Sequence, residues 1–386
     1  MLSFVGQARR ELFGLTRREH SGDPVSDRQH QVEHGSRDRY RQLDPPAKDG
    51  IRLRLGHLVG ECRESPLPTL AAVSEEGSCP ACGGALARWR TVESAEPALR
   101  GQAFTLLRCG SCGSAVTLEP APSDAHESGA YGSGPPRLAR LAAPILDAFD
   151  RRRLTLLSPM VVPPATLLDA GAGRGRFVAA ARHRGFEALG LEPSARGVET
   201  ALALGVPVLA ADISTADLAA GSFDAITLWH VLEHLDEPGA ALDRMRGWLR
   251  PGGALLVGVP NLASWQARLG GRRWFHLDVP RHRVHFTARG LDALLRAHGF
   301  VPISEHHVLL EHNPFGMWQS LVSRLTHRPS YLYNLLKRNA PAASADLAVT
   351  LVALPLAPVA ALVELFAGLA GRGGTLAVLA RAGEYD

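Results

Sequence analysis

Short apolar segments alternate with amphipathic stretches between residues 165 and 309. The apolar segments have the length of buried strands, and the stretches between them have the spacing of helices. The expected strands are 165–170, 186–191, 207–211, 223–229, 254–259 and 301–309, with a last strand at 375–380. Because each connection between parallel strands is a right-handed crossover, such an alternation gives a parallel sheet with helices on both faces. The sequence therefore predicts a doubly wound α/β fold.

The composition of the 386-residue chain is that of a globular protein, with 46% hydrophobic and 21% charged residues. Its formal net charge of +4 is small. Because phosphate binding needs a clustered basic face, this charge disfavours a nucleic-acid partner. The first twenty residues reach a pair of arginines before any long apolar core, so no secretory signal is expected and the predicted location is the cytoplasm.

Changes in composition divide the chain into four parts. Residues 1–75 mix charged residues with Pro and Gly without a period and are predicted to be a disordered leader. Residues 76–118 contain paired cysteines and glycines. Residues 119–160 are predicted to be a linker followed by a helix. Residues 161–386 hold the α/β domain, with an insertion at about 310–372 before the last strand.

A glycine-rich turn follows the first expected strand, in the segment LLDAGAGRG. Glycines at 171, 173 and 175 let the backbone turn sharply and approach a ligand with no side chain in the way. Their spacing is G-x-G-x-G, whereas a dinucleotide fingerprint reads G-x-G-x-x-G. The turn therefore disfavours a nicotinamide-dependent oxidoreductase.

Acidic residues lie at the ends of the first three strands: Asp169, Glu192 and Asp212. In doubly wound sheets, ligands bind beyond the carboxyl ends of the strands. Glu192 is placed to accept the two hydroxyls of a ribose, and Asp212 is within reach of an adenine amino group. Three acids around a glycine turn predict a site for an adenosyl cofactor without a phosphate, S-adenosylmethionine.

Five segments resemble class I S-adenosylmethionine-dependent methyltransferases, in particular the group that includes the ubiquinone-type O-methyltransferases. They are LLDAGAGRGRF, LGLEPS, FDAITLWHVLEHLDEP, LRPGGALLVGVPN and DVPRHRVHFT. The similarity runs from residue 131 to the end and is clearest over residues 165–305. It implies a seven-stranded Rossmann-like sheet whose last strand is antiparallel, and it implies an enzyme.

The resemblance also assigns the cofactor-binding residues by motif. They are Asp169, Gly171, Gly173, Glu192, Asp212, Ile213 and Trp229. The first three would hold the methionine part, the glutamate would hold the ribose, and Asp212 with Ile213 would hold the adenine. Trp229 and His230 would flank the cofactor near the transferred methyl group.

Methyl transfer to a hydroxyl needs a general base that titrates near neutrality, and histidine suits that role. The expected bases are His230 and His285, with Glu233 to orient one of them. His234 and His282 are further candidates, and Glu233 and His234 could instead simply start the helix after the fourth strand. The segment LWHVLEH also lacks the Asn/Asp-Pro-Pro-aromatic pattern of enzymes that methylate the amines of bases. The expected acceptor is a small molecule, a glycan or a lipid-linked compound, with oxygen as the target atom.

Two Cys-x-x-Cys pairs lie 26 residues apart, and a glycine follows each pair. Their cysteines are Cys79, Cys82, Cys109 and Cys112. Four thiolates make a closed tetrahedral zinc site with no open position, so the predicted zinc ribbon is structural. A disulfide pair or a vacated site is the alternative reading.

Ribbons of this kind also precede the catalytic domain in sugar C-methyltransferases and in some ribosomal RNA methyltransferases. A sugar C-methyltransferase and a ribosomal or transfer RNA methyltransferase are therefore alternatives to the O-methyltransferase. A protein that binds the cofactor without catalysis is a third alternative, which the three intact acids disfavour.

Residues 347–369 contain a single charge, Glu364, and two prolines. The segment is long enough to span a bilayer. The prolines and the strand expected directly after it argue against a span. The prediction is a helix that packs over the acceptor side of the fold, with peripheral contact to a membrane as the alternative.

Overall fold

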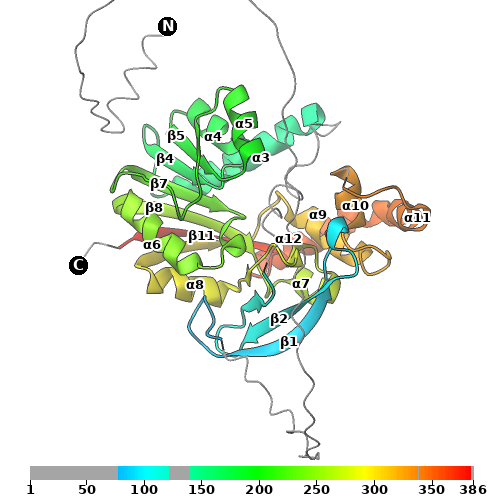
Figure 1. Cartoon of the computed structure of the whole chain (residues 1–386). Helices are drawn as coiled ribbons and strands as arrows, with labels where there is room; N and C mark the ends of the chain where they lie inside the picture. Colours follow the sequence, from blue (N-terminus) through cyan, green and yellow to red (C-terminus); the bar gives the residue numbers. More distant parts are fainter. Residues whose placement is uncertain (1–76, 121–138, 338, 384–386) are drawn as a thin grey trace, which may run out of the picture. The chain divides into compact units, whose positions relative to one another are not determined.

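The centre of the structure is a seven-stranded sheet (Figure 1). Its strands are β4 (Thr166–Ala170), β5 (Glu187–Glu192), β6 (Val208–Ala210), β7 (Phe223–Trp229), β8 (Leu249–Pro260), β10 (Phe300–His306) and β11 (Thr375–Ala382). Side by side they follow the order β10-β11-β8-β7-β4-β5-β6. Strand β11 is antiparallel to both neighbours, and the pairs from β8 to β6 are parallel. The prediction of a doubly wound, seven-stranded α/β fold is confirmed.

The computed structural model describes residues 77–120, 139–337 and 339–383. The leader predicted for residues 1–75 lies outside the described residues, as does most of the linker. The described residues all belong to one compact unit, Ser74–Asp386.

Helices cover both faces of the seven-stranded sheet (Figure 1). One face carries α3 (Ala139–Leu157), α4 (Arg176–His183) and α5 (Ala195–Ala203), and the other carries α6 (Pro238–Trp248) and α8 (Ala288–Ala297). Ser194 and Thr287 cap the starts of α5 and α8: the side chain of each accepts a hydrogen bond from a backbone N–H in the first turn.

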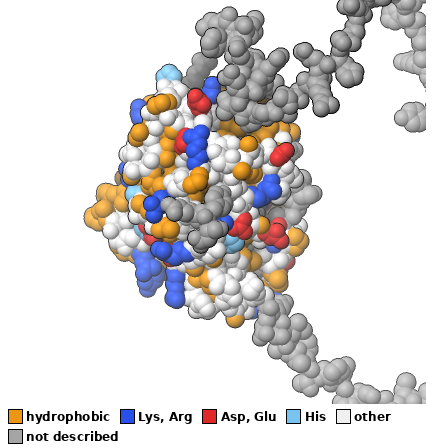
Figure 2. Space-filling model, turned by 90° about the vertical axis from the view of Figure 1, so that its left-hand side faces the viewer, with side chains coloured by type: hydrophobic (Ala, Val, Ile, Leu, Met, Phe, Trp, Pro, Cys, Tyr) orange, Lys and Arg blue, Asp and Glu red, His pale blue; other side chains and the backbone are white. Residues whose placement is uncertain are grey.

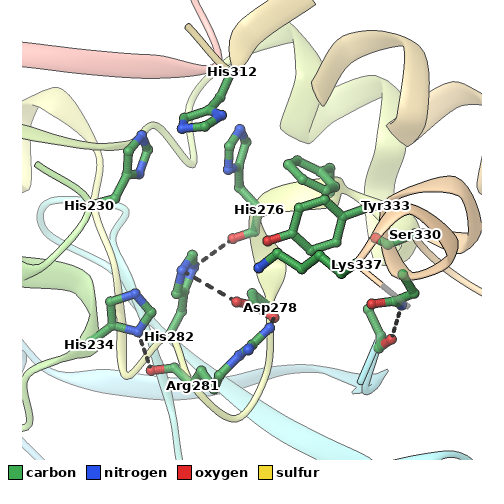
Figure 3. A pocket seen from close by; sticks show the side chains of 13 residues that line it. His230, His234, His276, Asp278, Arg281, His282, His312, Ser330, Tyr333 and Lys337 are labelled. Atoms are coloured by element: carbon green, nitrogen blue, oxygen red, sulfur yellow. Dashed lines mark hydrogen bonds and ion pairs between the residues drawn. The ribbon is translucent and has the colours of Figure 1, made fainter. Parts of the chain in front are cut away.

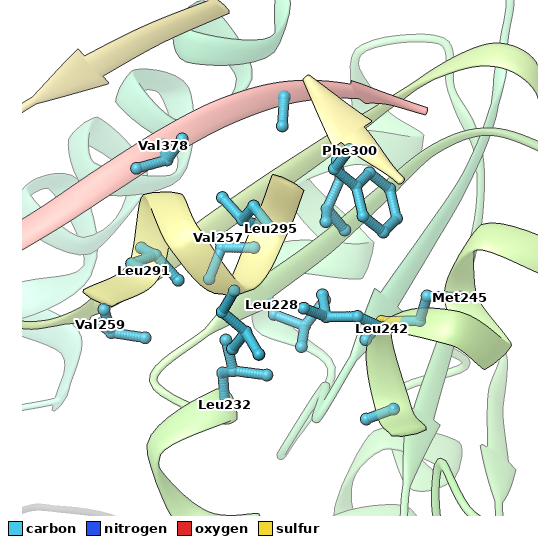
Figure 4. Close-up of a cluster of buried hydrophobic side chains, with 14 of the residues drawn as sticks. Leu228, Leu232, Leu242, Met245, Val257, Val259, Leu291, Leu295, Phe300 and Val378 are labelled. Atoms are coloured by element: carbon cyan, nitrogen blue, oxygen red, sulfur yellow. The ribbon is translucent and has the colours of Figure 1, made fainter. Parts of the chain in front are cut away.

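Apolar side chains fill the layer between the sheet and helices α6 and α8 (Figure 4). Leu228 and Val257 project from β7 and β8 and are fully buried. They belong to one cluster with Leu242 of α6 and with Leu291 and Leu295 of α8. Because each such side chain stabilises the fold by about 1.5–3 kcal/mol on burial, this layer fixes the strands whose ends carry the site.

A second sheet joins the cysteine-containing segment to the α/β domain. Its strands, in order, are β1 (Leu86–Glu93), β2 (Ala103–Cys109), β3 (Ala115–Thr117) and β9 (Val284–His285). The short helix η1 (Pro97–Leu99) lies between β1 and β2. Strand β9 comes from the loop before α8, and it pairs antiparallel with β3. The ribbon therefore shares its sheet with the α/β domain.

The expected insertion lies between β10 and β11 and is helical. It contains α9 (Asn313–Val322), α10 (Tyr331–Leu336), α11 (Ser344–Ala353), η5 (Leu354–Leu356) and α12 (Ala357–Leu369). The stretch Ser344–Leu369 is long and apolar enough to cross a membrane, with a mean hydropathy of 2.1. A 3₁₀ turn at Leu354–Leu356 separates α11 from α12, and it contains Pro355, which lacks the backbone N–H of a regular helix.

A buried ion pair ties the insertion to α3. Arg153 of α3 donates to both carboxylate oxygens of Glu311, and both side chains are at most 10% exposed. Arg176 of α4 contacts the same carboxylate at 3.1 Å. Burial alone would raise the pKa of Glu311, but the charge of Arg153 and neighbouring groups lowers it to about 2.

We expect Glu311→Gln to lower the free energy of unfolding by about 3 kcal/mol at pH 7, because it leaves Arg153 buried without its charge partner. Since the pKa is depressed in the folded state, this stabilisation is present above the unfolded value of about 4.3 and is lost as the pH falls toward 2. Urea unfolding from pH 7 to pH 3 would measure it, with the exposed Glu187→Gln as the control. Equal stability of both variants at pH 7 would contradict the prediction.

Candidate functional site

The turn after β4 has the backbone that its glycines predict. Gly171, Gly173 and Gly175 have φ values of 80°, 57° and 75°, in the left-handed region that side chains rarely adopt. A Cβ on Gly171 would lie 2.3 Å from Cγ2 of Val231. Because Val231 directly follows His230, the glycine turn lies against the segment that carries a predicted catalytic residue.

Two of the predicted carboxylates are buried at the ends of neighbouring strands. Glu192 accepts hydrogen bonds from the backbone N–H groups of Gly173, at 2.8 Å, and Ser194, at 2.9 Å. Asp169 accepts a 2.6 Å hydrogen bond from Oγ1 of Thr227. Burial raises the pKa of Asp169 to about 6, although the bond from Thr227 opposes the rise. The paired register of β4 and β5 brings both acids to the same edge of the sheet.

The remaining predicted cofactor residues lie at the same edge. Asp212 is two residues beyond β6, and its carboxylate accepts bonds from the backbone and hydroxyl of Ser214. Ile213 is buried beside it. Trp229 ends β7, and its indole N–H is buried without a hydrogen bond to any described residue.

These residues fit an S-adenosylmethionine site. Carboxylates at the ends of three adjacent strands supply acceptors for ribose hydroxyls and an adenine amino group, and the glycine turn offers a backbone without side chains. The indole N–H of Trp229 is a donor that still requires an acceptor.

A pocket of about 210 Å³ opens beside this edge (Figure 3). Five histidines line it: His230, His234, His276, His282 and His312. They come from the turn after β7, the loop before β9 and the segment before α9. Tyr333 of α10 and Lys337, directly after that helix, also line the pocket. The insertion therefore completes the pocket.

His230 and Glu233 form a hydrogen-bonded pair in this pocket. Nδ1 of His230 lies 3.0 Å from Oε1 of Glu233, which is 1% exposed, whereas the His230 side chain is 19% exposed. Burial alone would raise the pKa of Glu233, but the hydrogen bond and charge of His230 lower it below its usual value. A carboxylate on Nδ1 favours the tautomer with its lone pair on Nε2, the form that can take a proton.

Glu233, His234 and His282 bring donor atoms within 4.8 Å of one another and could hold a metal ion. Nδ1 of His234 lies 3.1 Å from the carbonyl of Arg281, and Nδ1 of His282 lies 2.9 Å from that of His276. Burial, with the neighbouring charge of His282, lowers the pKa of His234 to about 4, so its ring is neutral at pH 7.

A partly buried ion pair also lines the pocket. Nη2 of Arg281 donates to Oδ1 of Asp278 at 2.7 Å, and its Nη1 lies 3.6 Å from Glu96 of the ribbon. Although burial opposes ionisation, the charge of Arg281 holds the pKa of Asp278 well below its usual range. The guanidinium of Arg281 therefore has a structural role, because it is already paired with carboxylates.

The other predicted base, His285, is not brought to this pocket. It lies on β9, is 3% exposed, and its Nε2 contacts Oγ1 of Thr117 at 3.0 Å. Burial, with the charge of His282, lowers the pKa of His285 to about 3. The geometry joins His230 with Glu233 and places His285 in the contact between ribbon and domain.

Sequence reasoning missed several lining residues, including His276, His312 and Tyr333. His276 stacks on His230 with parallel rings whose centroids are 5.9 Å apart, and His312 is 5.3 Å from His230. Burial, with the charge of His230, lowers the pKa of His312 to about 4. These residues lie outside the resembling motifs: His276 is in the loop before β9, and the insertion contributes His312 and Tyr333.

The four cysteines of the ribbon cluster in the predicted way. Sγ of Cys79 lies 3.7 Å from that of Cys112, and Sγ of Cys82 lies 3.5 Å from that of Cys109. All four are free thiols within 4.8 Å of one another. Zinc with four sulfur ligands at about 2.3 Å keeps the sulfurs about 3.8 Å apart, so the cluster could hold that ion.

The ribbon also holds the loop that carries the pocket histidines. Oγ of Ser94 donates to the carbonyl of Val279, and Oγ1 of Thr117 donates to that of His282, both at 2.7 Å. Nδ2 of Asn334 in the insertion donates to the carbonyl of Ala95. The ribbon is thus part of the pocket's frame.

Residues 139–305 match the family model described as a methyltransferase domain. A protein named uncharacterized methyltransferase from Mycobacterium sp. (strain KMS) is 32% identical over 143 residues, which are 36% of this chain and 54% of that protein. The ubiquinone biosynthesis O-methyltransferase of Xanthomonas axonopodis pv. citri is 33% identical over 151 residues, which are 36% of this chain and 63% of that protein. The chain thus spans between half and two thirds of these relatives.

Among solved structures, the [4+2]-cyclase SpnF is 19% identical with a TM-score of 0.44, over 69% of this chain and 98% of that one. The 1,6-didemethyltoxoflavin-N1-methyltransferase of Burkholderia thailandensis is 20% identical with a TM-score of 0.36, over 70% and 96%. These values are too low to bear on function.

The sheet order, the glycine turn with its acids and the family match agree on one assignment. Residues 139–305 match a methyltransferase domain, and the order of the sheet and the glycine turn with its acids agree with the class I, S-adenosylmethionine-dependent form of that domain.

Proposed function

We propose that this protein transfers a methyl group from S-adenosylmethionine to a hydroxyl oxygen of a small-molecule or glycan acceptor. The observation that carries the proposal is the His230–Glu233 pair, which lines a pocket directly beside the glycine turn. The cofactor supplies an electrophilic methyl group. The protein's task is then to align an acceptor and to remove its proton.

In this proposal His230 is the general base. Its Nε2 takes the proton of the acceptor hydroxyl, and Glu233 holds the ring by Nδ1 and stabilises the positive charge that forms. Burial lowers the pKa of His234, His276 and His312, so these neutral rings act as hydrogen-bond partners of the acceptor and do not repel the charged imidazole.

We expect His230→Asn to reduce turnover about a hundredfold or more, because the general base is lost. Asparagine tolerates the left-handed backbone of residue 230, whose φ is 55°, so the fold is retained. Calorimetric affinity for S-adenosylhomocysteine should be unchanged, and His298→Asn, on the far end of α8, should keep full activity. Unchanged turnover in His230→Asn would remove His230 from the mechanism, and no binding to the wild type would remove the cofactor assignment.

We further propose that the four cysteines hold one structural zinc ion. Zinc would fix the knuckle at Cys112, whose carbonyl accepts a 2.8 Å bond from Oγ1 of Thr287 at the start of α8. Ser114 in the same knuckle accepts a bond from the N–H of Thr287. The ion therefore supports the pocket loop through the ribbon and takes no part in the chemistry.

Cys112→Ser should lower the zinc content from one ion per chain to well below one, and it should lower the melting temperature, because metal binding is coupled to folding. Metal analysis and thermal unfolding of the purified protein measure both effects. Cys62→Ser is the matched control, since Cys62 belongs to neither pair. A full zinc content in Cys112→Ser, or none in the wild type, would contradict the proposal.

These contacts favour a structural role of the ribbon over binding of ribosomal or transfer RNA. Its last strand is used to pair with β9, and its hydroxyls hold the pocket loop. On the face drawn in Figure 2, side chains of both charges lie among apolar ones.

We also propose that the protein works at a membrane surface on the cytoplasmic side, with a lipid-linked acceptor. The support is the reversed polarity of α11 and α12. Their polar side chains Asp346, Thr350 and Glu364 are at most 3% exposed. The large apolar side chains that point outward include Val352, Leu356, Leu362, Phe366 and Leu369, with exposures between 56% and 81%.

The charged side chains of the insertion also differ in burial. Its acids are Glu311, Asp346 and Glu364, and all three carboxylates are buried. Arg324 and Arg372 are exposed. An apolar stripe together with cations that pair with no carboxylate in the described part of the chain fits the boundary of an anionic bilayer. Because β11 returns the chain to the sheet directly after α12, contact along the surface fits better than a span.

Leu362→Asp with Phe366→Asp should abolish sedimentation with phosphatidylglycerol vesicles, because charge cannot enter the apolar layer. Leu202→Asp with Leu204→Asp is the matched control, since both leucines are exposed at the C-terminal end of α5. The wild type should bind vesicles of phosphatidylcholine alone more weakly. The proposal fails if the wild type does not bind vesicles and is a dimer, whereas the variant with Leu362→Asp and Phe366→Asp is a monomer. The stripe would then be a contact between two copies of the chain.

A further inference from the structure

A second cavity, of about 670 Å³, lies between the ribbon and α7 (Trp265–Gly270), beside η3 (Gly271–Arg273). Four arginines line it: Arg90, Arg108, Arg268 and Arg372. No carboxylate lines the cavity, and none of the four forms an ion pair with a carboxylate in the described part of the chain. The cavity is therefore a concentration of positive charge without a counter-charge.

Trp89 holds two of these arginines in place. The guanidinium carbon of Arg90 lies 3.2 Å from the centroid of the Trp89 ring, and that of Arg108 lies 4.8 Å from it. Such contacts attract a cation to the face of the ring without neutralising it. Burial, with the charges of Arg108 and Arg272, lowers the pKa of Arg90 to about 10, so Arg90 is still protonated at neutral pH.

Trp274 lines the same cavity, and its ring carries a buried donor. Its side chain is 3% exposed, and its indole Nε1 makes no hydrogen bond to any described residue. An indole N–H can only donate, so the atom that satisfies it must be an acceptor. Trp265 is 39% exposed at the cavity and offers an apolar ring.

We propose that this arginine–tryptophan groove binds the phosphate or diphosphate group of an organic ligand. A guanidinium presents paired N–H groups that match two phosphate oxygens, and Nε1 of Trp274 supplies a further donor. The ring of Trp265 packs against the apolar part of the ligand. Nothing in this assignment depends on methyl transfer.

The groove is next to the histidine pocket but is distinct from it. Trp274 and Leu277 line the groove, whereas Phe275 and His276, between them in sequence, line the pocket. The short helix η4 (Phe275–Leu277) therefore separates the two cavities. A ligand that fills the groove would fix the segment that holds His276 against His230.

Calorimetric titration of the full-length, zinc-replete protein with inorganic diphosphate at low salt tests the proposal. We expect one ion bound per chain. Arg90→Gln and Arg372→Gln should each weaken binding about tenfold or more, because each removes charged hydrogen bonds. Arg289→Gln, which changes the charge equally at an exposed position of α8, should leave the affinity unchanged.

Trp274→Phe keeps the ring and removes only the N–H, so it separates ligand binding from folding. It should weaken diphosphate binding several-fold at an unchanged melting temperature. The phosphate of a lipid headgroup is a second source of the same chemistry. If the headgroup is the source, Arg90→Gln should also weaken sedimentation with phosphatidic acid vesicles.

The proposal would be overturned if the protein bound neither diphosphate nor these vesicles. It would also be overturned if none of the three variants weakened binding. A single-stranded RNA oligonucleotide that binds more tightly than diphosphate, and loses its binding in Arg90→Gln, would make the groove an RNA surface and would also overturn it.

Discussion

The pairing of β3 with β9 is the interaction on which the rest of the site depends. Strand β9 has only two residues, yet the loop before it carries Asp278, Arg281 and His282. This loop lies outside the central sheet, so no strand of that sheet fixes it. Strand β3 of the ribbon pairs with β9 and fixes it. The hydroxyls of Ser94 and Thr117 also donate to the carbonyls of Val279 and His282, and these bonds hold the loop before β9. The N–H of Arg283 then bonds to the carbonyl of Glu233, which connects the ribbon to the turn after β7.

Burial sets the electrostatics of the two cavities in opposite ways. In the histidine pocket it keeps His234 and His312 neutral, and it allows charge only where a partner is present, as for Asp278 with Arg281. In the arginine–tryptophan groove the charges that line the cavity are of one sign, and the ring face of Trp89 lies against two of them, Arg90 and Arg108. The groove suits an anion.

The central fold could be predicted because its information is local. Apolar runs of strand length, glycine turns and capping residues each act within a few positions, and Ser194 and Thr287 cap the expected helices. The strand ends then place Asp169 and Glu192 together, because parallel strands bring their carboxyl ends to one edge. The cysteine pairs could be recognised for the same reason, because two thiols three residues apart can bind one metal ion.

The pocket could be predicted only in part. His230 and Glu233 lie three residues apart on one turn, so their contact follows from the chain itself. His285 has the same residue type and the same motif context, but β9 turns it toward Thr117 and away from the pocket. Which histidine faces a cavity depends on how β9 pairs with β3, and the contacting residues Thr117 and His285 are 168 residues apart in sequence. No local pattern encodes that pairing.

The sequence by itself determined the sheet, the acids around the cofactor crevice and the cysteine cluster, because each rests on neighbours along the chain or on the fixed geometry of parallel strands. Tertiary structure alone decided which histidines meet, that the insertion closes their pocket, that α11 and α12 turn their apolar side outward, and that four arginines share one groove. These features arise where segments from distant parts of the chain pack together, and burial and charge there depend on every neighbour at once.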